Sequence, residues 1–275
     1  MQIIDTHCHL DVKEFDTDRQ AVLMQARRKG VTAFVVPGID ADHWNRLWSL
    51  CANEPDLYPA LGLHPLFIER HRDYDLETLK SLLDKRRPVA VGEIGLDFFL
   101  KTPDRQRQQA LFEAQLELAR DAGLPVILHV RKAHDQVLSS LRRTGLHRGI
   151  SHAFNGSLQQ ASKYIDLGFK LGFGGMLTYE RSHKLHKLAR SLPLQAIVLE
   201  TDAPDLAVAQ HRGERNSPEY LPYCLNALAQ LRSEDLETIA HQTTVNAQEV
   251  LELDKWKSSW ANQQYAQYDI ENHHF

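Results

Sequence analysis

The feature that most limits how this chain can fold is a regular alternation of short apolar runs with longer amphipathic stretches. Runs such as Val31–Val36 and Val126–Arg131 are typical of buried parallel strands. Stretches such as Arg19–Lys29 and Asp104–Ala122 repeat apolar residues every three or four positions and are followed by glycine, which predicts helices. Eight strand–helix units follow one another up to Asp202, and this is the number that closes a (β/α)8 barrel.

This alternation places each expected element along the chain. Strands are expected at Ile3–His9, Val31–Val36, Leu57–Leu63, Val89–Asp97, Val126–Arg131, Gly149–Phe154, Phe169–Phe173 and Ala196–Asp202. Helices are expected at Arg19–Lys29, Asp42–Asn53, Leu76–Lys85, Asp104–Ala122, Ala133–Arg143, Leu158–Leu167 and Ser182–Ser191, and after an irregular segment at Pro218–Leu231 and Ser233–Leu251. We therefore predict an α/β fold, a single (β/α)8 TIM barrel with extra C-terminal helices over residues 1–256, followed by a polar tail at 257–275.

Composition argues against several other classes of protein. The first apolar run is interrupted by Asp5, and no apolar stretch approaches the roughly 18 residues of a membrane span, so we expect a cytoplasmic protein that does not bind membranes. Three widely spaced cysteines, Cys8, Cys51 and Cys224, suggest neither a disulfide framework nor a zinc ribbon. The formal net charge of −4 requires any polyanion to be bound by a local patch or by metal. We predict no obligate protein partner.

Side chains that bind metals stand at the C-terminal ends of five expected strands. The first strand ends in His7-Cys8-His9, where alternation puts both imidazoles on one face and leaves Cys8 to pack on the other. The later strands contribute Glu93, His129, His152 and Asp202. In a (β/α)8 barrel these strand ends meet at one mouth. Because such a buried cluster would hold unpaired charge without a cation, these six residues predict a divalent metal site.

Six sequence blocks occur in a fixed order between Met1 and about Leu251. They are Asp5–Asp11, Gly62–Pro65, Gly92–Asp97, His129–Arg131, Ser151–Ser157 and Glu200–Pro204. Together they resemble the signature of the TatD-type metal-dependent deoxyribonucleases, a family of the amidohydrolase superfamily of barrels. Two positions depart from that pattern: Asn155 stands where many relatives have serine, and Asp205 stands where an aromatic residue is common. Both departures bear on substrate preference more than on metal binding.

The resemblance implies two divalent ions, which could be zinc, manganese, magnesium or nickel. His7, His9 and Asp202 would hold one ion, His129 and His152 the other, with Glu93 bridging. The positive charge left over would favour a phosphate ester, and the ions would lower the pKa of bound water toward neutrality. Asp202, or else His64, would accept a proton. The function implied is hydrolysis of phosphodiester bonds in DNA ends or single strands, with Asp202 and Glu93 as catalytic residues.

Several further residues are expected near the mouth. Arg131 lies two residues after His129 on the same face, and we expect it to bind phosphate instead of forming a structural ion pair. His64 could contact substrate or satisfy a loop backbone. Glu200 is expected to orient a ligand histidine. Asp97 and Asp5 are candidates for the same role, and Asp97 could instead cap a loop.

Two rival functions remain open. A hydrolase of the same scaffold could act on a small ester, lactone or amide, although several such relatives carry a carbamylated lysine where this chain has Glu93. A non-catalytic metal-binding interaction protein is the other rival, but structural zinc sites are closed and four-coordinate. Basic and aromatic residues of the expected loops could follow a single nucleic-acid strand or be merely solvated: Arg70, Arg72, Lys101, Arg181, Lys184, Arg212, Arg215, Phe98, Phe99 and Tyr179.

Overall fold

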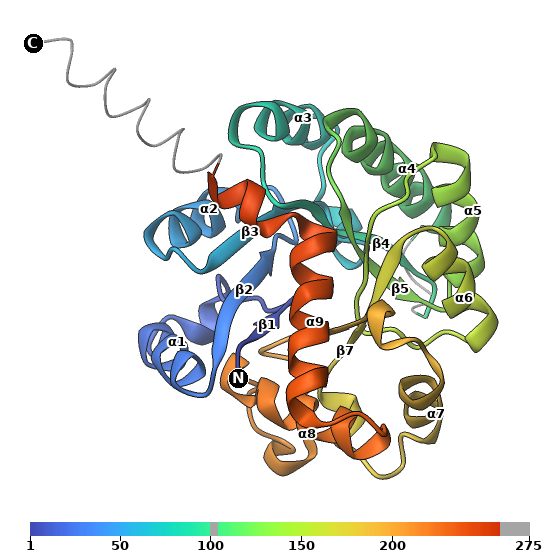
Figure 1. The fold of residues 1–275 in the computed structure, drawn as a ribbon. Helices are drawn as coiled ribbons and strands as arrows, with labels where there is room; N and C mark the ends of the chain where they lie inside the picture. Colours follow the sequence, from blue (N-terminus) through green and yellow to red (C-terminus); the bar gives the residue numbers. More distant parts are fainter. Residues whose placement is uncertain (100–103, 259–275) are drawn as a thin grey trace, which may run out of the picture.

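The computed structural model describes residues 1–99 and 104–258, which form a parallel eight-stranded sheet surrounded by helices (Figure 1). Each strand pairs with the next in sequence order. The strands are β1 (Ile3–Asp5), β2 (Val31–Pro37), β3 (Leu57–Leu61), β4 (Ala90–Asp97), β5 (Val126–Arg131), β6 (Gly149–Ser151), β7 (Phe169–Phe173) and β8 (Ile197–Leu199). The sheet closes where the N–H of Thr6 donates to the C=O of Leu199 at 3.0 Å and where Cys8 bridges to Ala203.

Helices fill the connections between successive strands and continue after β8. They are α1 (Arg19–Arg28), α2 (Trp44–Asn53), α3 (Asp75–Arg86), α4 (Arg105–Ala122), α5 (His134–Thr144), α6 (Leu158–Asp166), α7 (His183–Ser191), α8 (Leu221–Leu231) and α9 (Leu236–Leu251). Local signals set their ends: Asp104 accepts the N–H groups of Gln106 and Arg107, and Gly123 ends α4 with φ +65°. The predicted TIM barrel with extra C-terminal helices is confirmed.

Four strands, β1, β3, β6 and β8, end earlier than predicted, and in three of them this changes where candidate metal ligands lie. β1 ends at Asp5, β6 at Ser151 and β8 at Leu199, so His7, His152 and Asp202 follow the strands instead of belonging to them. The reason is a change of backbone direction, because Ala153 and Asp202 adopt left-handed φ values of +43° and +59°. Cys8 nevertheless is fully buried away from the site, as predicted.

The last two helices also start later than predicted. Residues Pro218–Tyr220 form a 3-10 turn, and α8 begins only at Leu221. Helix α9 begins at Leu236 because the Asp235 side chain accepts the N–H of Thr238. The predicted tail from 257 onward lies outside the described residues except for its first two positions.

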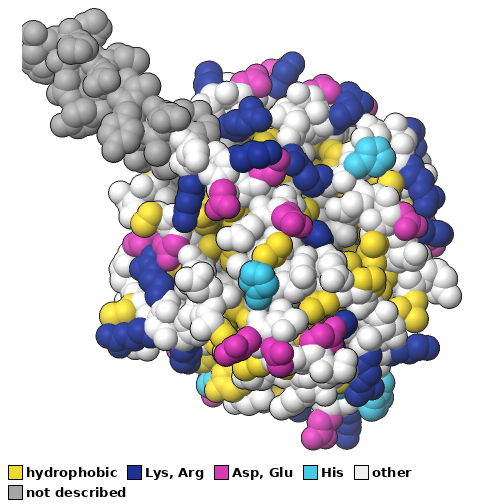
Figure 2. All heavy atoms as spheres, in the orientation of Figure 1, with side chains coloured by type: hydrophobic (Ala, Val, Ile, Leu, Met, Phe, Trp, Pro, Cys, Tyr) yellow, Lys and Arg dark blue, Asp and Glu magenta, His cyan; other side chains and the backbone are white. Residues whose placement is uncertain are grey.

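Helix α9 lies across the end of the barrel at which the strands begin (Figure 1). Its buried residues Ala247, Val250 and Leu251 pack in one cluster with Ile4 and Val198 of the barrel. On this face positive and negative side chains are interspersed, as the same view in Figure 2 shows. In the part of the chain that the structure describes, no helix has the length and apolarity to span a bilayer. With this end covered, chemistry is left to the opposite mouth.

Candidate metal centre

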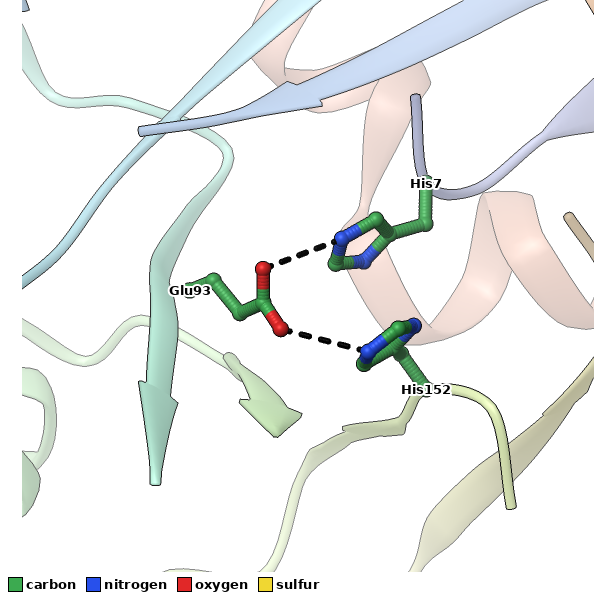
Figure 3. Close-up of side chains that lie close together, drawn as sticks. All are labelled: His7, Glu93 and His152. Atoms are coloured by element: carbon green, nitrogen blue, oxygen red, sulfur yellow. Dashed lines mark ion pairs between the residues drawn. The ribbon is translucent and has the colours of Figure 1, made fainter. Parts of the chain in front are cut away.

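The carboxylate of Glu93, on β4, lies at the centre of a buried histidine cluster. Its Oε2 atom is 3.2 Å from Nε2 of His7 and 3.5 Å from Nε2 of His9. Its Oε1 atom is 3.0 Å from Nδ1 of His129 and 3.2 Å from Nε2 of His152. Figure 3 shows the two oxygens pointing to His7 and His152 respectively. One carboxylate therefore divides the imidazoles into two sets.

Asp202 completes the set that faces Oε2. Its Oδ1 atom lies 3.5 Å from Nε2 of His7 and 3.7 Å from Nε2 of His9, and its N–H donates to the C=O of His7 at 2.8 Å. We name His7, His9 and Asp202 the β1/β8 half of the centre, and His129 and His152 the β5/β6 half. All six residues predicted as metal ligands are thus brought together. Their candidate ligand atoms form three overlapping groups, each within 4.8 Å: His7, Glu93 and His152; His7, His9 and Asp202; and His64, Glu93 and His129.

Each imidazole has one nitrogen that faces Glu93 and an outer nitrogen that points away from it. The hydrogen-bond partner of the outer nitrogen decides whether the inner nitrogen carries a lone pair. Nδ1 of His9 lies 3.1 Å from the C=O of Pro37, which can only accept, so the neutral ring has its lone pair on Nε2. Nε2 of His129 lies 3.1 Å from Oδ2 of Asp97, which leaves Nδ1 for the centre. His152 lies with Nδ1 3.6 Å from Glu200, and Nδ1 of His7 has no partner among the described residues.

Electrostatics differ between the two halves. Burial lowers the pKa of His7 well below its ordinary value. Burial also opposes a charge on His129, but the hydrogen bonds that its ring donates to the carboxylates of Asp97 and Glu93 outweigh this effect and raise its pKa. Burial likewise raises the pKa of Asp202 to about 6. These imidazole nitrogens converge on shared carboxylates, and the outer nitrogens of His7 and His152 make no hydrogen bond within 3.5 Å to any of the described residues. Such a donor set fits a divalent cation.

His64 joins this cluster in a role that the sequence did not reveal. It follows β3, is buried, and its Nε2 lies 3.2 Å from Oε1 of Glu93. Its Nδ1 accepts the N–H of Leu66 at 3.1 Å, so the proton of the neutral ring must sit on Nε2. His64 therefore presents an N–H donor and not a lone pair to the centre, and we exclude it from the metal ligands. The predicted backbone contact is present as well.

The three residues expected to orient ligands differ in what they hold. Asp97 contacts Nε2 of His129 and also accepts the N–H of Phe99 at 2.9 Å, so it supports both a ring and a loop. Glu200 lies behind His152 and accepts the N–H of Ala153 at 2.5 Å. Gly172 makes room for it, because a Cβ there would lie 2.1 Å from Oε2 of Glu200.

Asp5 acts on the backbone instead of on a ring. Its carboxylate accepts the N–H of His7 at 3.2 Å and both the N–H and the O–H of Thr201, at 3.0 Å and 2.6 Å. Burial raises the pKa of this carboxyl to about 7. It thereby connects the segment after β1 to the segment after β8, across the closure of the barrel.

A cavity of about 560 Å³ opens beside the centre and is lined by His129, His152 and Asp202 together with Arg131. The guanidinium of Arg131 lies 3.4 Å from Oδ2 of Asp97 and 4.3 Å from the ring centroid of Phe99. The alternative of a structural ion pair is thus present in the structure, while phosphate contact stays a prediction. The Arg131 side chain is 42% exposed and remains accessible from the cavity.

Most of the other basic loop residues are already paired. Arg72 binds Asp42 and Asp75, and Arg215 binds Asp18. Lys184 donates to the C=O of Asn155, and the predicted Lys101 lies outside the described residues. The basic residues whose contacts are known therefore stabilise loops, and they give little support to a continuous track for nucleic acid.

Two supporting residues on α4 were missed from the sequence. Gln115 accepts the N–H of Leu63 at 2.7 Å and donates to its C=O at 3.1 Å, which fixes the backbone before His64. Gln108 accepts the N–H of Asp97 at 2.9 Å. The two glutamines are seven residues apart, so they lie on one helix face, and polar residues on the apolar face were the signal that could have found them.

A (β/α)8 barrel with a buried histidine–carboxylate cluster at its C-terminal mouth is typical of one class of protein, the metal-dependent hydrolases. Within it, the family described as TatD related DNase matches residues 4–252. The chain belongs to this family and is a metal-dependent hydrolase. The family predicted from the six sequence blocks is confirmed.

Similar proteins agree with this assignment. The uncharacterized metal-dependent hydrolase YjjV of Escherichia coli K12 is 44% identical over 242 residues, which cover 87% of this chain and 93% of the relative. The uncharacterized metal-dependent hydrolase YabD of Bacillus subtilis is 32% identical over 253 residues, which cover 91% of this chain and 99% of the relative. The crystal structure of YjjV, a TatD homolog from Escherichia coli K12, superposes with a TM-score of 0.87 and 43% sequence identity. The superposition covers 90% of this chain and 97% of YjjV. An organophosphorus hydrolase of Deinococcus radiodurans, at 15% identity, TM-score 0.65 and coverage of 90% and 92%, shares the fold.

Proposed function

We propose that this protein hydrolyses phosphodiester bonds in DNA, at strand ends or in single strands, with two divalent cations. The observation that carries the proposal is the division of the Glu93 carboxylate between two sets of imidazoles, directly beside a cavity lined by Arg131. Paired sites of this kind are a common arrangement for phosphoryl transfer. Bound there, zinc, manganese, magnesium or nickel would supply Lewis-acid activation of water and of the ester.

The residues of the chain have separate roles in this proposal. Glu93 is shared by both halves, and His7, His9, Asp202, His129 and His152 complete the ligand set. The guanidinium of Arg131 binds a phosphate oxygen in this proposal, since the side chain is 42% exposed and lines the cavity. Asp202 is the proton acceptor in this proposal, because its carboxylate lies beside His7 and His9 and also lines the cavity in which the substrate would lie.

His64 adds the donor that the ligand histidines cannot provide. Its Nε2–H lies 3.2 Å from Glu93 and would hold either this carboxylate or a substrate oxygen that displaces the contact. A cytoplasmic site of action is part of the proposal. All three cysteines are free and buried thiols, as is usual for proteins of a reducing compartment.

A substrate panel tests the proposal. Protein loaded with each of the four metals would be assayed on single-stranded DNA, duplex DNA, RNA, a nitrophenyl phosphodiester and a lactone. We expect turnover of the phosphodiesters, with single-stranded DNA above duplex. Turnover of the lactone alone would favour the ester and amide hydrolase, and tight metal binding without turnover of anything would favour the interaction protein. The variant Asp254→Asn, changed at an exposed residue far from the mouth, is the control for purification and metal loading and should keep wild-type activity.

A further inference from the structure

The cavity beside the metal centre has an apolar wall that the hydrolytic chemistry does not use. Leu66, Met176, Leu177, Leu185 and Leu206 line it, next to Arg131 and the ligand residues. Met176 and Leu206 are 38% and 39% exposed, which places them among the few large apolar residues exposed on the described surface. Because exposed apolar groups that line a cavity mark sites of binding, this wall is expected to cover part of a substrate.

Asn155 lies at the same cavity, and its amide is held in one orientation. Its Nδ2 donates to the C=O of Ala153 at 3.2 Å, so its Oδ1 is the atom that faces Nε2 of His134 at 3.3 Å. His134 must then carry its proton on Nε2 and accept at Nδ1 from the O–H of Tyr164, 3.3 Å away. Burial lowers the pKa of His134, which agrees with this neutral form. One N–H of the exposed Asn155 amide remains for a ligand.

Charge divides the cavity into two parts. Arg131 is the only lysine or arginine among the described residues that line it, whereas the exposed carboxylate of Asp205 lines the same cavity. A second phosphate is therefore disfavoured beside Asp205. A neutral ring that accepts a hydrogen bond from Asn155 and packs on the leucines satisfies the remaining groups. The volume of about 560 Å³ falls within the range of roughly 300–1,000 Å³ for small-molecule sites, so one nucleoside fits and a duplex does not.

We infer that this cavity binds the base of the nucleotide whose phosphate reacts, with Asn155 as the residue that recognises the base and His134 as its positioning residue. The inference rests on the proposed function, because it assumes a nucleotide phosphate at the metal centre. It goes beyond it in assigning a subsite to the uncharged part of the substrate. It also gives a role to one of the two departures from the family pattern, Asn155, whose amide contacts Ala153 and His134.

Two substrates with the same leaving group test this inference: the p-nitrophenyl ester of thymidine 5′-phosphate and methyl p-nitrophenyl phosphate, which has no base. The measured quantity is the ratio of kcat/KM for the thymidine ester to that for the methyl ester. Asn155→Leu should lower the ratio about threefold to tenfold, as expected for one lost hydrogen bond to a neutral group. His134→Phe should lower it similarly, and His134→Gln, which can still donate, should restore part of it.

Leu206→Asn tests the apolar wall and should lower the same ratio several-fold; asparagine tolerates the left-handed φ of +50° at this position. Asn53→Leu, on the exposed end of α2, is the matched control and should leave the ratio unchanged. An equal loss on both esters in Asn155→Leu would show that Asn155 acts only through the His152 loop, and an unchanged ratio would show that no base is recognised. Either result overturns the inference while the proposed function stands.

Binding gives a readout that does not depend on turnover. Thymidine 5′-phosphate and inorganic phosphate would be titrated calorimetrically into wild-type protein and Asn155→Leu. We expect the substitution to weaken only the nucleotide. If the wild type hydrolyses neither ester but still binds thymidine 5′-phosphate through Asn155, the proposed function fails and the subsite stands. Equal affinity of both proteins for the nucleotide contradicts the subsite.

Discussion

The two halves of the metal centre share Glu93 but are supported in different ways. In the β5/β6 half the outer nitrogens face carboxylates, Asp97 at 3.1 Å from His129 and Glu200 at 3.6 Å from His152. In the β1/β8 half, His9 has only the backbone C=O of Pro37 behind it. Carboxylates raise the basicity of an imidazole more than a carbonyl does. If each half holds a cation, as proposed, the β5/β6 half should bind its cation in stronger competition with protons, and four predictions test this difference.

The largest effect is expected where the halves meet. Glu93→Gln removes the one charge that both halves use, so we expect loss of both cations and a fall in kcat/KM on the order of 10³-fold. Metal content by mass spectrometry and kcat/KM on a phosphodiester measure this. The exposed change Glu249→Gln serves as control. A variant that retained one cation at full affinity would show that the carboxylate belongs to a single half.

Asp202→Asn should impair the β1/β8 half alone. We expect activity to fall about 10²- to 10³-fold, since a ligand and a proton acceptor are lost together. Folding should survive, because asparagine has nearly the same size as aspartate and also tolerates the left-handed φ of +59° at this position. Thermal unfolding of the metal-free variant within a few degrees of wild type, with activity lost, supports this. Unchanged activity would favour the non-catalytic interaction protein.

Asp97→Asn should weaken only the β5/β6 half. Residues behind metal ligands typically contribute about 10- to 100-fold in metal affinity, and Asp97 lies within hydrogen-bond distance of His129. A calorimetric titration that resolves two binding events should show one weakened and one unchanged. Glu200→Gln should have a smaller effect on the same event, because its contact with His152 is longer. Equal weakening of both events would remove the distinction between the halves.

The smallest effect is expected from a change in pH. Cation affinity should change up to about tenfold per pH unit for each proton that binding displaces. Burial opposes the charge on His129 and His152, but neighbouring carboxylates raise both pKa values above the ordinary 6.5. Cation binding must displace these protons, so the affinity of the β5/β6 half should rise with pH until they are gone. The β1/β8 half should change less, since burial lowers the pKa of His7. Calorimetric titrations in buffers of different ionisation enthalpy measure how many protons each binding event releases. Proton release only from the binding event of the β1/β8 half would contradict the prediction.

Much of the fold could be predicted because each barrel unit is a local pattern. Strands such as Val126–Arg131 and Phe169–Phe173 were placed to the residue, since buried parallel strands are continuous apolar runs. The C-terminal ends of β1, β3, β6 and β8 were misplaced. Their boundaries depend on backbone turns at residues such as Ala153 and Asp202, whose left-handed φ values have no apolar pattern to announce them.

The candidate site was predictable in its members and not in their connections. Six ligand candidates could be chosen because (β/α)8 barrels gather strand ends at one mouth. The N–H that His64 presents, the ion pair of Arg131 with Asp97, and the support of Asn155 by His134 could not, since each depends on which atoms meet across different loops.

Sequence alone therefore determined the architecture, the family and the candidates for metal binding, because these follow from periodicity, from the resemblance of six sequence blocks and from residue chemistry. Only the tertiary structure decided how Glu93 is shared, which nitrogen of each imidazole faces the centre, and which uncharged residues shape the cavity. The physical reason is that proton positions and lone-pair directions are set by hydrogen-bond partners that lie far apart along the chain, such as Pro37 for His9 and Asp97 for His129.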